Sequence, residues 1–233
     1  MTTRTIFASI DVAGFIQDYQ QELTNYYGID VTAQTVTPAL KAVLLSIKNG
    51  TKPLKKIGYY DTSVLPSYTR LISGKYSTIG YKVTSADYSW IDQSKGELRL
   101  NNIYNLMISA DPGDKIVWWG HSIRANSYIQ AIISDVHKVN PQSGRPAEFT
   151  NFKRKNVQFY YASSALDPTN LLDGVSVATQ QVYCMECILN GTSGTTVSYD
   201  IDLMLLSASF EDEGSLISVP IVQIVVDPTI VIK

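Results

Sequence analysis

The chain has few of the residues on which many enzymes and exported proteins depend. It contains only 2 cysteines and 2 histidines among 233 residues, and 17% of its residues are charged. So few cysteines give no disulfide framework, which fits a reducing compartment. The sequence also lacks a G-x-S-x-G nucleophile elbow, a phosphate loop, a dinucleotide fingerprint and a zinc-protease helix. We therefore expect no enzyme activity, no catalytic residues and no cofactor.

Long apolar runs and clustered positive charge are missing too. Asp11 interrupts the first apolar stretch, so the N-terminus does not read as a signal peptide, and no stretch is long enough to cross a bilayer. We expect a cytoplasmic chain without a membrane span. The net charge is −2, and the one basic run is short, comprising Lys153, Arg154 and Lys155. This balance argues against a nucleic-acid partner, because affinity there depends on many clustered cations.

The sequence is instead dominated by β-strand patterns. Apolar and polar residues alternate in short stretches that are separated by turns rich in Gly and Asp, as in half-exposed antiparallel strands. This spacing predicts a mainly β fold, an antiparallel two-sheet β-sandwich, built as a single domain over residues 1–233. The clearest inward-facing positions are Tyr183, Met185, Cys187, Leu189, Tyr199, Ile201, Leu203 and Leu205.

Other segments of the C-terminal half are predicted from the same signals. Residues 157–161 read as a strand and residues 167–174 as a loop. Residues 216–226 should close the sheet, and residues 229–232 form a short tail.

One or two short helices are predicted near the N-terminus. Asp11 can cap the first, whose apolar residues recur at helical spacing from Phe15 to Tyr26. Thr37 followed by Pro38 opens the second, because proline has no N–H to leave unpaired at a first helical position. The apolar stripe of this second helix consists of Leu40, Val43, Leu44 and Ile47, although the run from Val43 to Leu45 would also suit a strand.

The segment 51–77 is long, irregular and rich in tyrosine. Loops of this kind are usually packed down or bound to something, and we expect insertions between core strands at residues 30–77 and 140–174. Tyrosine buries a large area for few rotatable bonds, and a net charge of −2 leaves little repulsion between copies. The expected partner is therefore the chain itself, in a homo-oligomer or lattice. The expected contact residues are Tyr59, Tyr60, Tyr68 and Tyr76.

A second group of candidate residues surrounds the aromatic strand predicted over residues 115–119. Trp118 and Trp119 are adjacent, so one faces inward and the other outward, and the sequence leaves open which. The outward ring could stack on a sugar, which makes carbohydrate an alternative partner. The candidate ligand-binding residues are Asp111, Asp114, Trp118, Trp119, His121 and Asn126.

Acidic residues and the two cysteines raise the question of a bound metal. Asp111 and Asp114 flank a Pro-Gly turn, where carboxylates suit calcium, although aspartate also favours turns for its backbone hydrogen bonds. Cys184 and Cys187 match C-x-x-C, but on a strand they point to opposite faces. We expect the two aspartates to stabilise the turn. We expect both cysteines to be free thiols, without a disulfide or a bound metal. Calcium is considered only as part of the carbohydrate-binding alternative.

Three separated stretches, in the same order, together resemble the AidA/PixA inclusion-body protein family. The N-terminal TIFASIDVAGFI resembles the opening strand of that family. The central strands of that family are resembled by two stretches of this chain, GELRL and PGDKIVWWGHSI, and by Asn126 and Tyr128 after them. Its closing hairpin resembles VSYDIDLMLL and SLISVPIVQIVVDPTIVI.

This resemblance implies a bacterial cytoplasmic protein with a β-sandwich fold, in a family some of whose members accumulate as crystalline inclusions. It supplies no catalytic residues. The leading prediction is a non-enzymatic protein that self-associates, including as an intracellular inclusion. The alternative is a lectin-like carbohydrate-binding module, with its calcium dependence left open by the sequence.

Overall fold

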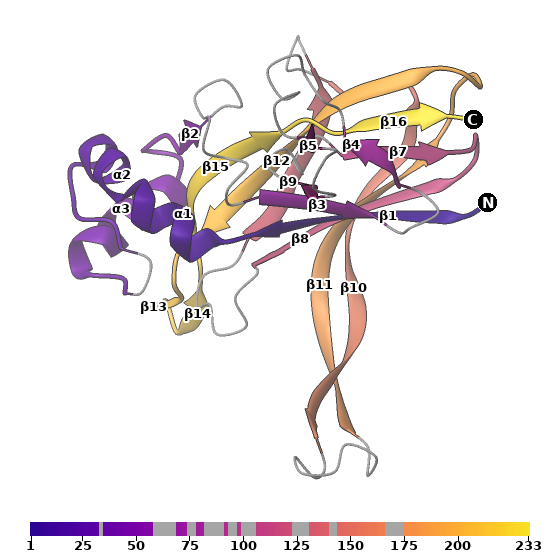
Figure 1. Ribbon diagram of the computed structural model, residues 1–233. Helices are drawn as coiled ribbons and strands as arrows, with labels where there is room; N and C mark the ends of the chain where they lie inside the picture. The colour runs from indigo at the N-terminus through magenta and orange to yellow at the C-terminus, as the bar shows by residue number, and fades with distance from the viewer. Residues whose placement is uncertain are drawn as a thin grey trace.

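The computed structural model describes residues 1–32, 35–57, 69–73, 78–81, 91–92, 97–98, 106–122, 131–139, 144–165 and 175–233. Its strands form two large sheets, and three short helices lie together at one end of the molecule (Figure 1). One apolar core contains residues from both sheets and from the helices. The expected fold class, a mainly β two-sheet sandwich with short N-terminal helices, is confirmed.

The first sheet has the strand order β10-β11-β8-β1-β3. Every second residue of β1 faces the core, so that Ile6, Ala8 and Ile10 are fully buried. The strands of this sheet are β1 (Thr3–Ile10), β3 (Thr69–Ser73), β8 (Lys115–Ser122), β10 (Phe149–Ala165) and β11 (Val175–Leu189).

The second sheet has the strand order β2-β15-β12-β16-β7-β4, and β9 also pairs with β12. The inward positions predicted for β12 are confirmed, since Tyr199, Ile201, Leu203 and Leu205 are all fully buried. Its strands are β2 (Lys55–Ile57), β4 (Thr78–Tyr81), β7 (Leu106–Ala110), β9 (Ala131–Lys138), β12 (Thr196–Leu206), β15 (Pro220–Val226) and β16 (Thr229–Ile232). Two short hairpins pair β5 (Ile91–Asp92) with β6 (Glu97–Leu98) and β13 (Phe210–Asp212) with β14 (Ser215–Ile217).

Both large sheets are mixed rather than purely antiparallel. β1 pairs in parallel with β8, β2 with β15, and β7 with β16. Side chains alternate with the same period in parallel and antiparallel strands, so the sequence pattern does not report the direction of a neighbouring strand.

The segment expected to be a short tail is a central strand. β16 lies between β12 and β7, and its residues Ile230 and Ile232 are fully buried. The expected single strand over residues 216–226 is likewise divided into β14 and β15. The four residues of β16 thus join two halves of the second sheet.

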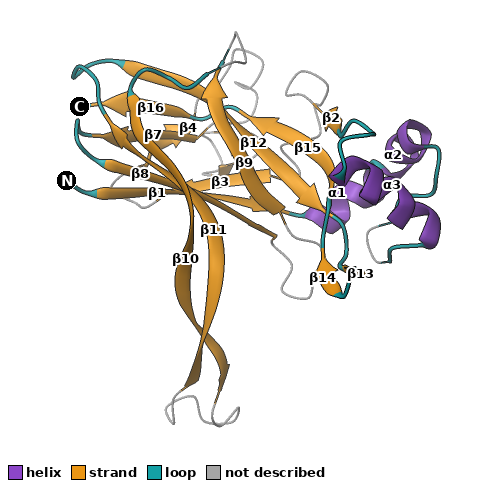
Figure 2. Cartoon of the chain, turned by 180° about the vertical axis from the view of Figure 1, so that it is seen from behind, coloured by secondary structure: helices purple, strands orange, loops and turns teal. Residues whose placement is uncertain are grey.

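The helices are α1 (Val12–Asp18), α2 (Gln20–Tyr27) and α3 (Pro38–Lys48), and they lie beyond one end of the sheets (Figure 2). Both predicted caps are confirmed. The Asp11 carboxylate accepts a hydrogen bond from the Gly14 N–H at 3.0 Å, and the Thr37 hydroxyl accepts one from the Leu40 N–H at 3.2 Å. The first predicted helix is divided at Tyr19, which gives three helices instead of two.

The β10–β11 hairpin projects from the body of the molecule as a two-stranded ribbon (Figures 1 and 2). β11 pairs with β8 only over residues 185–188, whereas its pairing with β10 continues to Ala165 opposite Val175. The projecting part, residues 157–165 and 175–183, is called the arm below. The strand predicted at 157–161 is therefore present but belongs to a far longer one.

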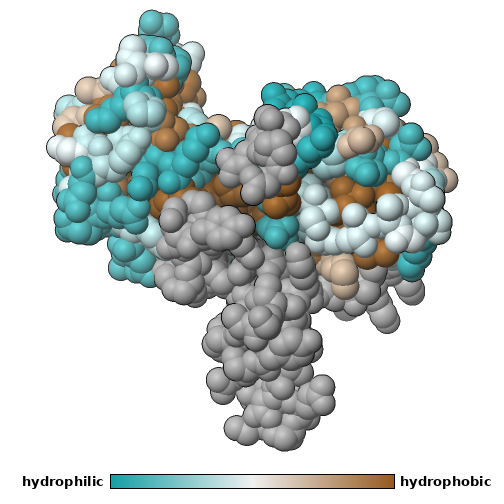
Figure 3. Space-filling view, turned by 90° about the horizontal axis from the view of Figure 1, so that it is seen from above, coloured by the Kyte–Doolittle hydropathy of each residue, from teal (hydrophilic) through white to brown (hydrophobic). Residues whose placement is uncertain are grey.

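Seen from above, the surface is mainly hydrophilic over the helices, and hydrophobic residues show in bands between hydrophilic ones (Figure 3). None of the described helices is both long and apolar enough to cross a membrane.

Candidate functional site

β8 places the two adjacent tryptophans on opposite faces of the first sheet. Trp118 is fully buried, and its Nε1–H donates to the Tyr199 hydroxyl oxygen at 3.0 Å. Its ring packs against Phe149, with the ring centroids 5.3 Å apart. Trp119 lies on the outer face, so it is the outward ring that the sequence could not distinguish.

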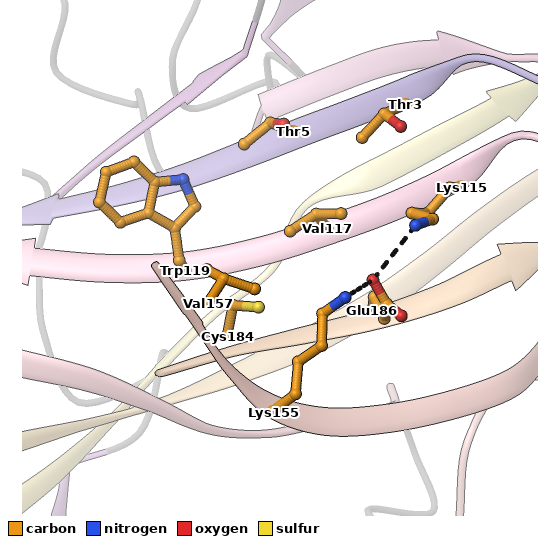
Figure 4. Close-up of a pocket in the computed structure, with 9 residues that line it drawn as sticks. All are labelled: Thr3, Thr5, Lys115, Val117, Trp119, Lys155, Val157, Cys184 and Glu186. Atoms are coloured by element: carbon orange, nitrogen blue, oxygen red, sulfur yellow. Dashed lines mark ion pairs between the residues drawn. The ribbon is translucent and has the colours of Figure 1, made fainter. Parts of the chain in front are cut away.

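Trp119 forms one wall of a shallow pocket of about 200 Å³ on this outer face. Its cross-strand neighbour Phe7 packs against it, with the ring centroids 4.5 Å apart. Side chains from β1, β8, β10 and β11 meet around the pocket (Figure 4). The lining residues are Thr3, Thr5, Lys115, Val117, Trp119, Lys155, Val157, Cys184 and Glu186.

A carboxylate between two lysines sets the charge of the pocket. The Glu186 carboxylate lies 2.6 Å from the Lys155 Nζ and 3.5 Å from the Lys115 Nζ (Figure 4). The hydrogen bond from Lys155 lowers the pKa of Glu186, so this carboxyl stays ionised at neutral pH. The three groups leave one net positive charge beside the Trp119 ring.

Cys184 lines this pocket, whereas Cys187 belongs to the core, so the two side chains lie on opposite faces of β11 as expected. Burial raises the pKa of the Cys184 thiol and raises that of Cys187 to about 12. Both thiols are therefore protonated at neutral pH, and neither is an activated nucleophile.

Asp114, in the turn before β8, fixes the start of the chain. Its carboxylate accepts hydrogen bonds from the Thr2 N–H at 2.6 Å and from the Arg4 Nε–H at 2.9 Å. Burial alone would raise the pKa of Asp114, but these bonds outweigh it and lower the pKa. Asp111 is more exposed and pairs with Arg4 at 3.4 Å. The Arg4 guanidinium therefore occupies the position between the two carboxylates that a calcium ion bound by both would need.

The other candidate residues are only partly visible. His121 lies in β8 opposite Ser9, but its side chain is outside the described part of the structure. The remaining candidates are also outside the described residues; they are Tyr59, Tyr60, Tyr68, Tyr76 and Asn126. Of the four proposed ligand residues whose side chains the structure describes, only Trp119 lines the pocket, and Trp118 lies on the opposite face of the sheet.

A cluster that the sequence did not predict lies on the outer face of the second sheet. His137 on β9 stands opposite Asp200 on β12. Its Nδ1 lies 2.9 Å from the Lys138 carbonyl oxygen and its Nε2 lies 3.1 Å from the Asp202 carboxylate. Because both ring nitrogens face acceptors, the geometry fits the doubly protonated imidazolium.

The same contacts explain how this cluster titrates. Burial alone would lower the pKa of His137, but the bonds to Lys138 and Asp202 outweigh it and raise the pKa. Burial raises the pKa of Asp200 to about 6. The spacing of Asp200 and Asp202 places both on one face of a strand, and this was the one sign of the cluster that the sequence offered. Their contact with His137 depends on the pairing of two strands that are far apart in the sequence.

Asp135 ties the base of the arm to β9. Its carboxylate accepts hydrogen bonds from the Nη2 atoms of Arg145 and Arg154, each at 3.0 Å. Arg154 also donates to the Ser134 carbonyl at 3.2 Å, and the Arg145 guanidinium lies 3.9 Å above the Phe152 ring centroid. These contacts fix where β10 leaves the body.

In the part of the chain that the structure describes, no group of three or more His, Cys, Asp or Glu side chains is arranged to hold a metal ion.

Comparison with known proteins gives a distant structural similarity. No protein-family model matches the chain, and no curated protein matches it. Among solved structures, the chain is similar to the crystal structure of an inclusion body protein, PixA, from Burkholderia cenocepacia. The TM-score is 0.49 and the identity 14%, over 97% of this chain and 94% of that chain. A similarity this low does not indicate function.

Proposed function

We propose that this protein is a non-enzymatic protein that self-associates and accumulates in intracellular inclusions. The observation that carries the proposal is the projecting arm. A two-stranded hairpin alone is at best marginally stable in water, so a surface packed on the arm would stabilise it. Val177 on the arm is 64% exposed, while most apolar residues of the body are buried.

Charge supports the same proposal. The net charge of −2 provides little repulsion between copies at neutral pH. The sequence resemblance to inclusion-body proteins points the same way. The tyrosines expected to form contacts, Tyr59, Tyr60, Tyr68 and Tyr76, remain a second proposed surface.

The chemistry of the described residues supports a non-enzymatic role. The Cys184 thiol is protonated, and the Glu186 carboxylate is held by two lysines. His137 is engaged at both ring nitrogens. An activated nucleophile needs a base within reach whose proton-accepting atom is free, and none of these three residues meets that need.

Sedimentation velocity at several concentrations tests the proposal, together with electron microscopy of cells that make the protein. We expect assemblies that grow with concentration and dense particles in the cells. A variant with Tyr59, Tyr60 and Tyr68 changed to Ser tests the second surface. A wild-type protein that stays monomeric at high concentration and forms no particles would contradict the proposal.

The alternative function is carbohydrate binding, and the outer pocket favours it. Trp119 offers a ring face, while Thr3, Thr5 and the lysines offer polar groups around it. A glycan array with and without a chelator tests this alternative and its calcium dependence. Trp119→Ala should abolish any signal, whereas Val177→Ala, outside the pocket, should leave it unchanged.

A further inference from the structure

The two edges of the arm differ in how they are protected. On the arm, β10 carries a bulge between Ala162 and Ser164, where its pairing with β11 shifts by one residue; a second bulge lies in the body, between Thr150 and Lys153. Lys153 and Lys155 lie on the same strand just before the arm begins. Bulges and lysines are devices that keep an edge strand from pairing with another chain.

The β11 edge of the arm has no bulge, and neither strand carries a charged residue along the arm. Pairing with β10 is regular from Val177 to Gln181, and in the described part of the structure no strand pairs with the other side of residues 177–183. The sequence there is VATQQVY, which contains no charge, no proline and no glycine. Regular, uncharged, β-prone edges are templates for strand addition.

We infer that this edge is where two copies of the chain meet, with β11 of one copy pairing antiparallel to β11 of the other about a two-fold axis. The product is a continuous four-stranded sheet of two arms. A two-fold contact is self-complementary, since residue i of one copy meets residue j of the other and the reverse. This inference rests on the proposed function and names the surface that performs it.

The charge of the edge selects a second copy as the occupant. Residues 177–183 bring no like charges together when identical copies pair, and they give a charged partner nothing to bind. Thr179 and Gln181 are exposed polar side chains on the arm, as is Gln158 opposite Gln181. Polar side chains and an open backbone edge suit another strand and would be costly against lipid.

Lysine substitutions test the inference. Thr179→Lys together with Gln181→Lys places like charges against each other at the two-fold contact, and we expect the dissociation constant of the dimer to rise by at least about tenfold. Ser193→Lys adds the same charge on an exposed loop of the body and should leave it unchanged. Gln158→Lys adds it beside Gln181 but on the bulged strand, and should have a clearly smaller effect than the pair on β11.

Cysteine cross-linking tests the register. Single substitutions from Val177→Cys to Gln181→Cys should yield a disulfide-linked dimer on mild oxidation at the residue nearest the axis, since directly opposed residues lie close enough to bridge. Ser193→Cys should not cross-link.

The outcomes separate this inference from the proposed function. If the wild type self-associates and the β11 lysines leave it unaffected, or if Gln158→Lys acts equally, edge pairing by β11 is wrong while self-association stands. If the wild type is monomeric at every concentration, both fail.

Discussion

The body and the arm are made of similar strands but differ in what covers them. In the body, each sheet buries one face against the other, and residues such as Trp118 and Tyr199 are fully buried. In the arm, two strands have no third strand beside them among the described residues, and Val177 is 64% exposed. The body thus buries most of its large apolar side chains, although Leu216 is exposed, whereas the arm leaves one backbone edge of each strand without a partner among the described residues.

The difference locates stability and association in separate parts of the chain. Changes in the core should alter the free energy of unfolding, and changes in the arm should alter the contact between copies.

The largest effect is expected for Trp118→Ala. It removes a fully buried ring together with its hydrogen bond to Tyr199, and should lower the free energy of unfolding by about 3–5 kcal/mol. Trp119→Ala, on the outer face, is the matched control and should cost clearly less. Urea denaturation of both variants measures the difference; equal losses would mean that the core is not centred on Trp118.

Asp114→Asn should have the next largest effect. The amide cannot supply the charge that pairs with Arg4 or accept every bond that the carboxylate now receives, so we expect a loss of about 1.5–3 kcal/mol. Asp111→Asn, at a side chain that is 58% exposed, should cost less than about 1 kcal/mol. Thermal and urea unfolding test the pair, and a reversed order would contradict the anchoring role of Asp114.

Stability should fall as the pH rises through the range in which the His137 cluster titrates. The pKa of Asp200 is raised from 3.8 to about 6, so folding loses stability as the pH rises through this interval. The pKa of His137 is raised above 6.5, so its stabilisation is complete below pH 6.5 and is lost as the pH passes the raised value. Melting temperatures from pH 4 to pH 9 measure both steps.

Variants assign the two steps of that profile. Asp200→Asn should flatten the acidic step and His137→Gln the step above pH 6.5. A wild-type profile that rises from pH 6.5 to pH 8 would be incompatible with this cluster.

The smallest effect on stability is expected when the arm is shortened. Asn156 and Tyr183 are paired, so an Asn-Gly turn can join them in place of residues 157–182. The free energy of unfolding should change by less than about 1 kcal/mol, because none of the described strands of the body pairs with the removed residues. Self-association through the arm should disappear. A loss of several kcal/mol would show that the arm supports the body.

Local patterns in the sequence predicted much of the body. The alternation in β12 correctly placed Tyr199 and Leu203 inward, and the caps at Asp11 and Thr37 formed as expected. These features depend on period and on groups close in the chain, which a sequence displays directly.

The features that the sequence did not predict depend on distant pairing. The His137 cluster exists because β9 pairs with β12 in one register, and the pocket exists because β1 lies parallel to β8. The projection of the arm was also missed, because alternation in β11 looks the same whether or not a second layer covers it. The choice between Trp118 and Trp119 needed the same information, since adjacent residues of a strand are equivalent until one face is buried.

The position of β16 also has a consequence for synthesis of the chain. Because β16 lies between β12 and β7, the strands β7 and β4 cannot join the rest of the second sheet until residues 229–232 have been made. While the ribosome is still adding those residues, the edges of β7 and β12 that will receive β16 are open to other strands. The nascent chain therefore passes through a stage with two unpaired sheet edges, and crowded synthesis is the condition under which wrong pairing between copies would begin.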